Sequence, residues 1–251
     1  MDSNIHTIAI DGSFDDCQSL LKEVFRDVSF KEDLKLGAVN SVNWARVLAQ
    51  TVYYFSIYIQ LGMPRAFQVA VPTGNFGNIF SAYVAKQMGL PIERLILATN
   101  QNDILHRAIS EGKYEATHVS ETISPSMDIQ IASNFERLIY DLNDHDSSQT
   151  LDDMKNIKQK SQYIINNEKL KKINKDFLSA RMSEQQTLDV IKNIYEKFNM
   201  ILDPHTAIGY GAFDKHNLKG NNIVLATAHP CKFPDAILKA INLKSDLPEE
   251  L

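Results

Sequence analysis

Segments whose apolar residues recur with helical spacing alternate along this chain with short apolar runs. The short runs predict strands at residues 5–10, 66–71, 95–98 and 222–226. The helical spacing predicts helices at residues 14–26, 42–61, 79–88, 103–111, 188–198, 205–212 and 234–241. Gly89 and Gly112 stand where two of these helices are expected to stop. Strand–helix alternation of this kind predicts the α/β class, with a mostly parallel sheet flanked by helices.

The pattern changes in the middle of the chain. From about residue 141 to residue 180, Asp, Asn, Lys, Ser and Gln dominate, and apolar residues such as Leu151, Met154 and Ile157 are widely spaced. Helical periodicity persists there, so the segment is not expected to be disordered. We interpret it as an exposed, polar helical insert or lid outside the core.

Composition narrows the function classes. The chain has 251 residues, 44% of them hydrophobic, as in soluble globular proteins, and a net charge of -5, which argues against general nucleic-acid binding. Its most apolar stretch, residues 47–61, is interrupted by Gln50, Ser56 and Gln60 and predicts a buried helix, not a membrane span. Cys17 and Cys231 lack metal-ligand spacing. With no signal peptide recognisable, we expect a metal-free cytoplasmic protein.

The most distinctive short motif is Pro-Thr-Gly-Asn-Phe-Gly-Asn at residues 72–78, between a predicted strand and a predicted helix. Glycines let the backbone approach an anion closely, and the first N–H groups of a helix point at it with the positive end of the dipole. The motif is neither the Gly-x-x-x-x-Gly-Lys-Ser/Thr of nucleotide hydrolases nor the Gly-x-Gly-x-x-Gly of dinucleotide-binding folds. Its spacing alone allows either a phosphate site or an ordinary turn.

A second polar group begins the long helix expected from about residue 42. Asn40 and Ser41 are placed to initiate this helix, and Arg46 falls within its second turn. Two short polar side chains and a guanidinium can converge there on one dianion. The alternative is that Asn40 or Ser41 only caps the helix and Arg46 lies on a solvated face.

Several motifs together resemble threonine synthases, a family of fold-type II enzymes that use pyridoxal phosphate (PLP). The matching segments are residues 12–18, 40–46, 71–83, 89–92, 98–107, 124–130, 203–207 and 227–233. They fall in the family's order and cover nearly the whole chain except the polar insert. The resemblance implies a fold-type II architecture that is incomplete at its N-terminal side.

The resemblance also implies roles for individual residues. Gly74, Asn75, Phe76, Gly77 and Asn78 match the loop that wraps the PLP phosphate. The family commonly has Asp at the last position, so Asn78 keeps hydrogen-bonding capacity and loses a negative charge.

Thr227 matches the hydroxyl that meets the pyridine nitrogen of the cofactor. Asn40, Ser41 and Arg46 match a site for the substrate's phosphate, to which Asn75 is a further candidate contributor.

Other polar residues in these motifs allow two interpretations, a contact with substrate or a structural role. His106, His205 and His229 are candidate substrate contacts, although a structural role is the more common one for such histidines. Ser126, Asp128 and Gln130 match the family and are as well explained by fixing a loop.

No catalytic residue is assigned, because the lysine that binds the cofactor as a Schiff base has no counterpart here. The Phe-Lys-Glu-Asp at residues 30–33 superficially echoes the family's lysine motif, but Lys31 stands in the wrong place, with the wrong neighbours. In the family that lysine lies upstream of everything seen in this chain. We therefore expect residues 1–38 to end a smaller central domain and residues 39–251 to form the large PLP-binding domain.

For an intact enzyme the resemblance implies a lyase of threonine biosynthesis that converts O-phospho-L-homoserine and water to L-threonine and phosphate. This chain alone is expected to be inactive, and the missing segment is a candidate partner in trans. Two alternatives stay open: a threonine-synthase-like phospho-lyase, and a non-catalytic fragment or partner of a lysine-bearing chain.

Overall fold

The computed structural model describes residues 4–12, 14–40 and 43–243. The chain divides into two compact units, Met1–Val39 and Asn40–Leu251. The domain identities suggested for these two parts stay predictions.

The first unit contains two helices, α1 (Phe14–Arg26) and α2 (Val28–Asp33). Asp27 begins α2 by accepting a hydrogen bond from the backbone N–H of Phe30 at 3.0 Å. The strand predicted at residues 5–10 is wrong: these residues form no strand, and Ile8 is 82% exposed. A strand is stable only beside a neighbour, and no described segment pairs with this one.

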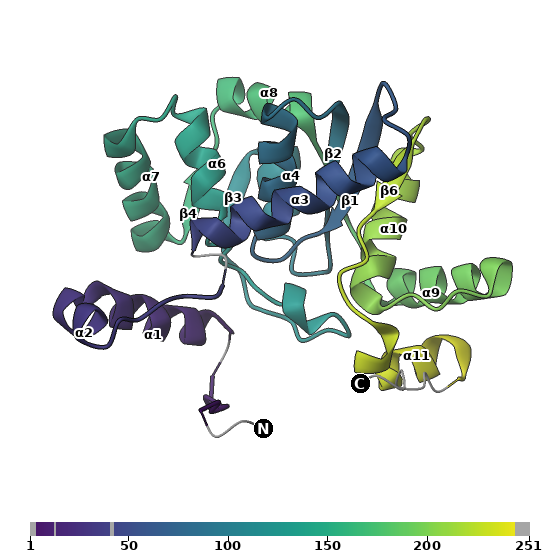
Figure 1. The fold of residues 1–251 in the computed structure, drawn as a ribbon, viewed down its shortest axis with the longest axis horizontal. Coiled ribbons are helices and arrows are strands. Elements are labelled where there is room, and N and C mark those ends of the chain that lie inside the picture. Colours follow the sequence, from purple (N-terminus) through teal and green to yellow (C-terminus); the bar gives the residue numbers. More distant parts are fainter. Residues whose placement is uncertain (1–3, 13, 41–42, 244–251) are drawn as a thin grey trace. The chain divides into compact units, whose positions relative to one another are not determined.

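The second unit is built on a four-stranded sheet (Figure 1). Its strands are β1 (Phe67–Pro72), β2 (Ile92–Thr99), β5 (Phe177–Arg181) and β6 (Asn222–Val224). They lie in the order β5-β2-β1-β6, and every pair is parallel. The predicted parallel sheet is therefore confirmed.

Helices surround this sheet. Their bounds are α3 Trp44–Gln60, α4 Gly77–Gln87, α5 Ile104–Glu111, α6 Phe135–Leu142, α7 Ser147–Lys160, α8 Asn167–Asp176, α9 Glu184–Phe198, α10 Pro204–His216 and α11 Pro234–Ile241. Short 3-10 turns lie at Pro125–Met127 and Pro230–Lys232, and a small antiparallel pair joins β3 (Lys113–Glu115) to β4 (Gln162–Ile164). No helix in the described ranges combines the length and the apolar character that a membrane crossing requires.

Alternate residues of the strands enter two different cores. Val69 and Leu95 pack in a core that also contains buried residues of α3, α4, α5 and α6. Their neighbours Ala70 and Ile96 face the other way and pack with Ile208 of α10. Because side chains alternate between the two faces of a strand, both faces of the sheet are covered, as expected for a parallel sheet.

Helix α3 begins later than predicted. Asn43 is its N-cap, and the side chain of Asn43 accepts a hydrogen bond from the backbone N–H of Ala45 at 3.0 Å. Asn40 is therefore not the cap, because a closer asparagine takes that position. Arg46 consequently lies in the first turn of the helix instead of the second.

The polar segment is partly an exposed insert and partly core. Helices α7 and α8 carry most of its charges, and Figure 1 shows α7 at the opposite end of this unit from α9 and α11. The expectation that the whole segment stays outside the core is wrong, because Ile165, Ile173 and Phe177 are buried in the core. Phe177, 1% exposed, begins strand β5, which pairs with β2. Strand β5 is only five residues long and follows the polar helix α8, so its apolar residues did not stand out in the sequence.

Candidate functional site

The candidate site lies where the strand order of the sheet reverses. The chain passes from β1 to β2 and β5 on one side, and then returns to place β6 on the other side of β1. The carboxyl ends of β1 and β6 are adjacent, because the two strands are parallel neighbours. Ligands of open parallel sheets bind at the carboxyl ends of strands beside such a reversal.

A cavity of about 540 Å³ opens there. It is lined by Arg46 of α3, by residues 74–78 after β1, and by Thr227 after β6. Among the described lining residues there is an arginine and no carboxylate. Neither α3 nor α4 has an acidic residue in its first turn to offset the positive end of its dipole. The cavity is therefore suited to an anion.

The loop between β1 and α4 has the geometry of an anion cradle. Phe76, the residue before α4, has a left-handed backbone with φ of 64°, and no side chain caps the helix. Its ring is 1% exposed and packs edge-on against Phe135, with ring centroids 5.2 Å apart. The side chain of Phe76 thus anchors the loop, while the backbone N–H groups at the start of α4 are left to meet an anion.

Two partners distant in sequence hold the side chains of this loop. The Asn75 side-chain oxygen accepts hydrogen bonds from Ser133, from the backbone N–H at 2.6 Å and from the hydroxyl at 2.7 Å. The buried hydroxyl of Tyr54 donates to the side-chain oxygen of Asn78 at 2.6 Å. Sequence reasoning did not single out Ser133 or Tyr54, because nothing local marks a residue whose partner is 24 or 58 positions away.

Thr227 is held by the start of α10. Its backbone N–H donates to the Thr206 hydroxyl oxygen at 3.3 Å, and that hydroxyl donates in turn to Asp203. Asp203 is 1% exposed and caps α10 by accepting from the backbone N–H of His205 at 2.9 Å. The Asp-Pro pair before a helical pattern is a start signal from which this cap was predictable.

The other predicted site residues differ in where they lie. Asn40 does not line the cavity, and Ser41 lies outside the described residues. Ser126 does line it. The Asp128 carboxylate accepts hydrogen bonds from Asn100, Asn102 and Thr122 at 2.7–2.9 Å, so it fixes a loop, as the structural alternative proposed.

The three candidate histidines differ in their surroundings. His106 Nδ1 lies 2.9 Å from the Ser179 hydroxyl, and burial lowers its pKa. His229 Nδ1 lies 2.9 Å from the Cys231 sulfur. Neither is among the described residues that line the cavity, whereas His205 is.

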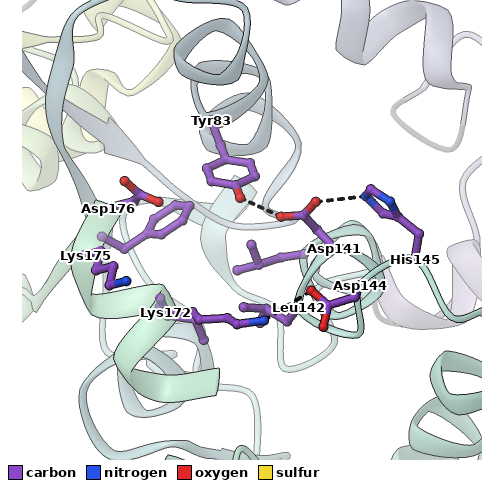
Figure 2. Close-up of a pocket in the computed structure, with 11 residues that line it drawn as sticks. Tyr83, Asp141, Leu142, Asp144, His145, Lys172, Lys175 and Asp176 are labelled. Atoms are coloured by element: carbon purple, nitrogen blue, oxygen red, sulfur yellow. Dashed lines mark hydrogen bonds and ion pairs between the residues drawn. The ribbon is translucent and has the colours of Figure 1, made fainter. Parts of the chain in front are cut away.

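A second cavity, of about 360 Å³, lies between α4 and the polar segment (Figure 2). Figure 2 shows the hydroxyl of Tyr83 directed at Asp141, which also meets His145; the two distances are 2.5 Å and 3.1 Å. Lys172 pairs with Asp144 at 3.2 Å. These polar groups are hydrogen-bonded or ion-paired with one another. The residues around this cavity therefore attach the polar segment to α4.

Replacing Tyr83 with phenylalanine should lower the free energy of unfolding by about 1.5 kcal/mol, because a hydrogen bond to a carboxylate is lost. Burial and Asp141 raise the pKa of Tyr83, so the folded protein keeps a proton that the unfolded chain releases above pH about 10. The contribution of the Tyr83 hydroxyl to stability is therefore fully present below that pH and is lost as pH rises above it. Urea unfolding of both proteins below and above that pH checks this.

The free energy of unfolding should fall less steeply with rising pH in Tyr83→Phe than in the unchanged protein. Tyr210→Phe, which alters an exposed tyrosine, is the control and should behave like the unchanged protein. Equal slopes for all three would contradict the prediction.

Known proteins resemble this chain in sequence and in fold. A protein-family model described as "Threonine synthase, C-terminal" matches residues 206–251. Over 240 residues the chain is 45% identical to a curated threonine synthase of Pseudomonas aeruginosa, covering 94% of this chain and 51% of that protein. A human protein named threonine synthase-like 1 is 34% identical over 254 residues, which cover 94% of this chain and 34% of that protein.

Among solved structures, PLP-bound threonine synthase from Brucella melitensis matches with a TM-score of 0.90 and 47% identity. The match covers 99% of this chain and 54% of that one. The fold-type II architecture is thereby confirmed. The chain spans about half the length of the threonine synthases it matches. In sequence and in fold, the chain corresponds to a C-terminal part of threonine synthases.

Proposed function

We propose that this chain forms the anion-binding and ring-contacting part of a PLP-dependent threonine synthase. The reaction is the conversion of O-phospho-L-homoserine and water to L-threonine and phosphate. One observation carries the proposal: a single cavity is lined by Arg46, the loop of residues 74–78 and Thr227, which come from three separate segments. These are the positions that the family resemblance assigned to the substrate phosphate, the cofactor phosphate and the cofactor ring.

The residues present fit pyridoxal phosphate. The cavity volume lies in the range of about 300–1,000 Å³ that small-molecule sites occupy. At Gly74 a Cβ atom would lie 2.6 Å from the carbonyl oxygen of Ser126, so this position needs glycine for the loop to approach its neighbour. The uncapped start of α4 supplies backbone donors for a phosphate.

When bound, pyridoxal phosphate supplies the electron-withdrawing ring that makes neighbouring carbon atoms of the substrate acidic. The chain's own residues bind and orient the cofactor and the substrate. The neutral hydroxyl of Thr227 would hold the ring nitrogen without the charge that a carboxylate would bring. Arg46 and the first turn of α3 stabilise the negative charge that grows on the departing phosphate.

The cofactor-binding lysine is proposed to come from a further polypeptide segment. None of the described residues lining the cavity is a lysine. Helix α3 also exposes a stripe of apolar residues, Leu48, Val52 and Ile59, which are 47%, 62% and 64% exposed. A helix that is apolar on all sides is normally buried, so this stripe fits a covering segment.

The product of the reaction distinguishes the two candidate activities. When the lysine-bearing segment is supplied, a synthase should release threonine, and a phospho-lyase should release a keto acid.

The anion role of Arg46 gives a direct test. Arg46→Ala should weaken the binding of inorganic phosphate to this chain about tenfold, because a charge-assisted contact worth about 1.5 kcal/mol is lost. Isothermal titration with phosphate and with pyridoxal phosphate measures the effect.

Arg65→Ala is the matched control. Arg65 is also an exposed arginine of the second unit and does not line the cavity, so its removal should leave both affinities unchanged. Equal weakening by the two substitutions would show only a general charge effect and would contradict the proposal. Failure of the unchanged chain to bind either molecule would overturn the proposed function.

A further inference from the structure

His205 is a buried polar side chain that the proposed function does not use. It lies in the first turn of α10, is 4% exposed, and lines the cavity beside Thr227. Its Nδ1 atom lies 3.1 Å from a carboxylate oxygen of Asp203. Its Nε2 atom is buried and has no hydrogen-bond partner among the described residues. A buried polar atom without a hydrogen-bond partner lowers the stability of the fold by about 1–3 kcal/mol, so the position of this atom needs an explanation.

The surroundings of the ring fix which nitrogen carries the proton. Burial alone would raise the pKa of Asp203, but hydrogen bonds from His205 and Thr206 outweigh it and hold this pKa below its usual value. Asp203 is therefore a carboxylate, which only accepts hydrogen bonds, and Nδ1 of His205 must donate. In the neutral imidazole the lone pair then resides on Nε2.

Packing holds the ring in this orientation. The ring of Phe233 lies against it, with the centroids 4.9 Å apart. Asp203 also accepts from Thr206, whose hydroxyl oxygen in turn accepts from the backbone N–H of Thr227. The imidazole and the Thr227 segment are thus positioned by the same carboxylate.

We propose that Nε2 of His205 is a ligand contact of the cavity that accepts a hydrogen bond from an N–H or O–H group of the bound molecule beside Thr227. This inference rests on the proposed function and adds an acceptor to it. Arg46 and the start of α4 are donors, and they select the anionic end of a ligand. Nε2 selects a donor, such as the ring hydroxyl of pyridoxal phosphate or the amino group of an amino acid.

Two substitutions separate the two nitrogens of the ring. Asparagine at position 205 keeps a polar atom near Nδ1, within reach of Asp203, and has none at the place of Nε2. Glutamine places its amide oxygen near Nε2. His205→Asn should weaken the binding of pyridoxal phosphate about tenfold, and His205→Gln by no more than about threefold. Neither should alter the binding of inorganic phosphate, which is bound by the donors, Arg46 and the start of α4.

Nitrogen NMR of the unchanged chain with labelled histidine tests the inference without any substitution. In the free chain Nδ1 of His205 should be protonated and Nε2 bare, and saturation with pyridoxal phosphate should shift the Nε2 resonance. A protonated Nε2 in the free chain, or an unmoved Nε2 resonance in the saturated complex, would overturn the inference while leaving the proposed function intact. A chain that cannot be saturated with pyridoxal phosphate would overturn both.

Discussion

Replacing Asp203 with alanine should lower the free energy of unfolding by about 3–5 kcal/mol, the range found when one member of a buried charged network is removed. Its carboxylate accepts from two backbone N–H groups at the start of α10, from the His205 ring and from the Thr206 hydroxyl. Alanine leaves these donors buried without an acceptor. Thermal unfolding should show a fall in Tm on the order of 10 °C.

An exposed cap of the same geometry is the control. Asp146 begins α7 by accepting from the backbone N–H groups of Ser148 at 2.8 Å and Gln149 at 3.0 Å. Asp146→Ala should cost only about 1 kcal/mol, because water can satisfy the released donors. Similar losses for the two alanine variants would show that burial of the Asp203 network adds nothing to the cap.

The same carboxylate gives a pH dependence with a definite sign. The pKa of Asp203 is lower in the folded protein than its ordinary value, so folding favours the ionised form. Its contribution to stability is present above the pKa of the unfolded chain, about 3.9, and is lost as pH falls through the folded-state pKa. Unfolding curves should therefore converge for the unchanged protein and Asp203→Asn as the solution is made acidic.

Replacing Gly74 with alanine should abolish most anion binding. The added Cβ would lie 2.6 Å from the carbonyl oxygen of Ser126 and 3.3 Å from the Cα of Met127. Both are backbone atoms, which cannot swing aside as a flexible side chain does, so the loop must move. We expect the affinity for phosphate and for pyridoxal phosphate to fall more than tenfold, and stability to fall by about 1–3 kcal/mol.

Gly37→Ala is the control for this substitution. A Cβ atom at Gly37 meets no atom within 4 Å, so neither affinity nor stability should change by more than the general effect of alanine for glycine. Titration calorimetry and urea unfolding measure both quantities. Normal phosphate affinity in Gly74→Ala would show that the close approach of the loop to Ser126 is not needed for the anion site.

Local signals in the sequence predicted most elements correctly. Helix α5 ends at Gly112, whose φ of 72° is left-handed, and α11 begins with Pro234 at its first turn. The apolar run at residues 66–71 became β1 within one residue. Such elements follow from turn chemistry and hydrophobic spacing, which depend on near neighbours alone.

Two errors about strands come from pairing that local sequence does not determine. The apolar run that includes Ile8 has the pattern of a buried strand but no described strand beside it. Phe177–Arg181 has a weak pattern and becomes a strand because β2 lies beside it. Both outcomes depend on which segment is adjacent in space, and spacing along the chain does not supply that information.

For the site, the residues that line the cavity were predictable from the sequence, and the residues that hold them in place were not. Spacing left the loop at residues 74–78 ambiguous, and only the family resemblance joined it to Arg46 and Thr227. The geometry explains why they meet: β1 and β6 are parallel neighbours and end at the same edge. Tyr54 and Ser133, which fix the loop's side chains, had no local signal.

The left-handed backbone of Phe76 has a consequence for how a ligand is received. A bulky residue in that region carries a conformational penalty of about 1–3 kcal/mol, and the surrounding aromatic side chains stabilise it whether or not an anion is present. The loop is therefore preorganised, and its backbone entropy is lost during folding instead of at association. Since ordering one residue costs about 1–2 kcal/mol, a mobile loop of the same sequence would bind phosphate weaker by several powers of ten.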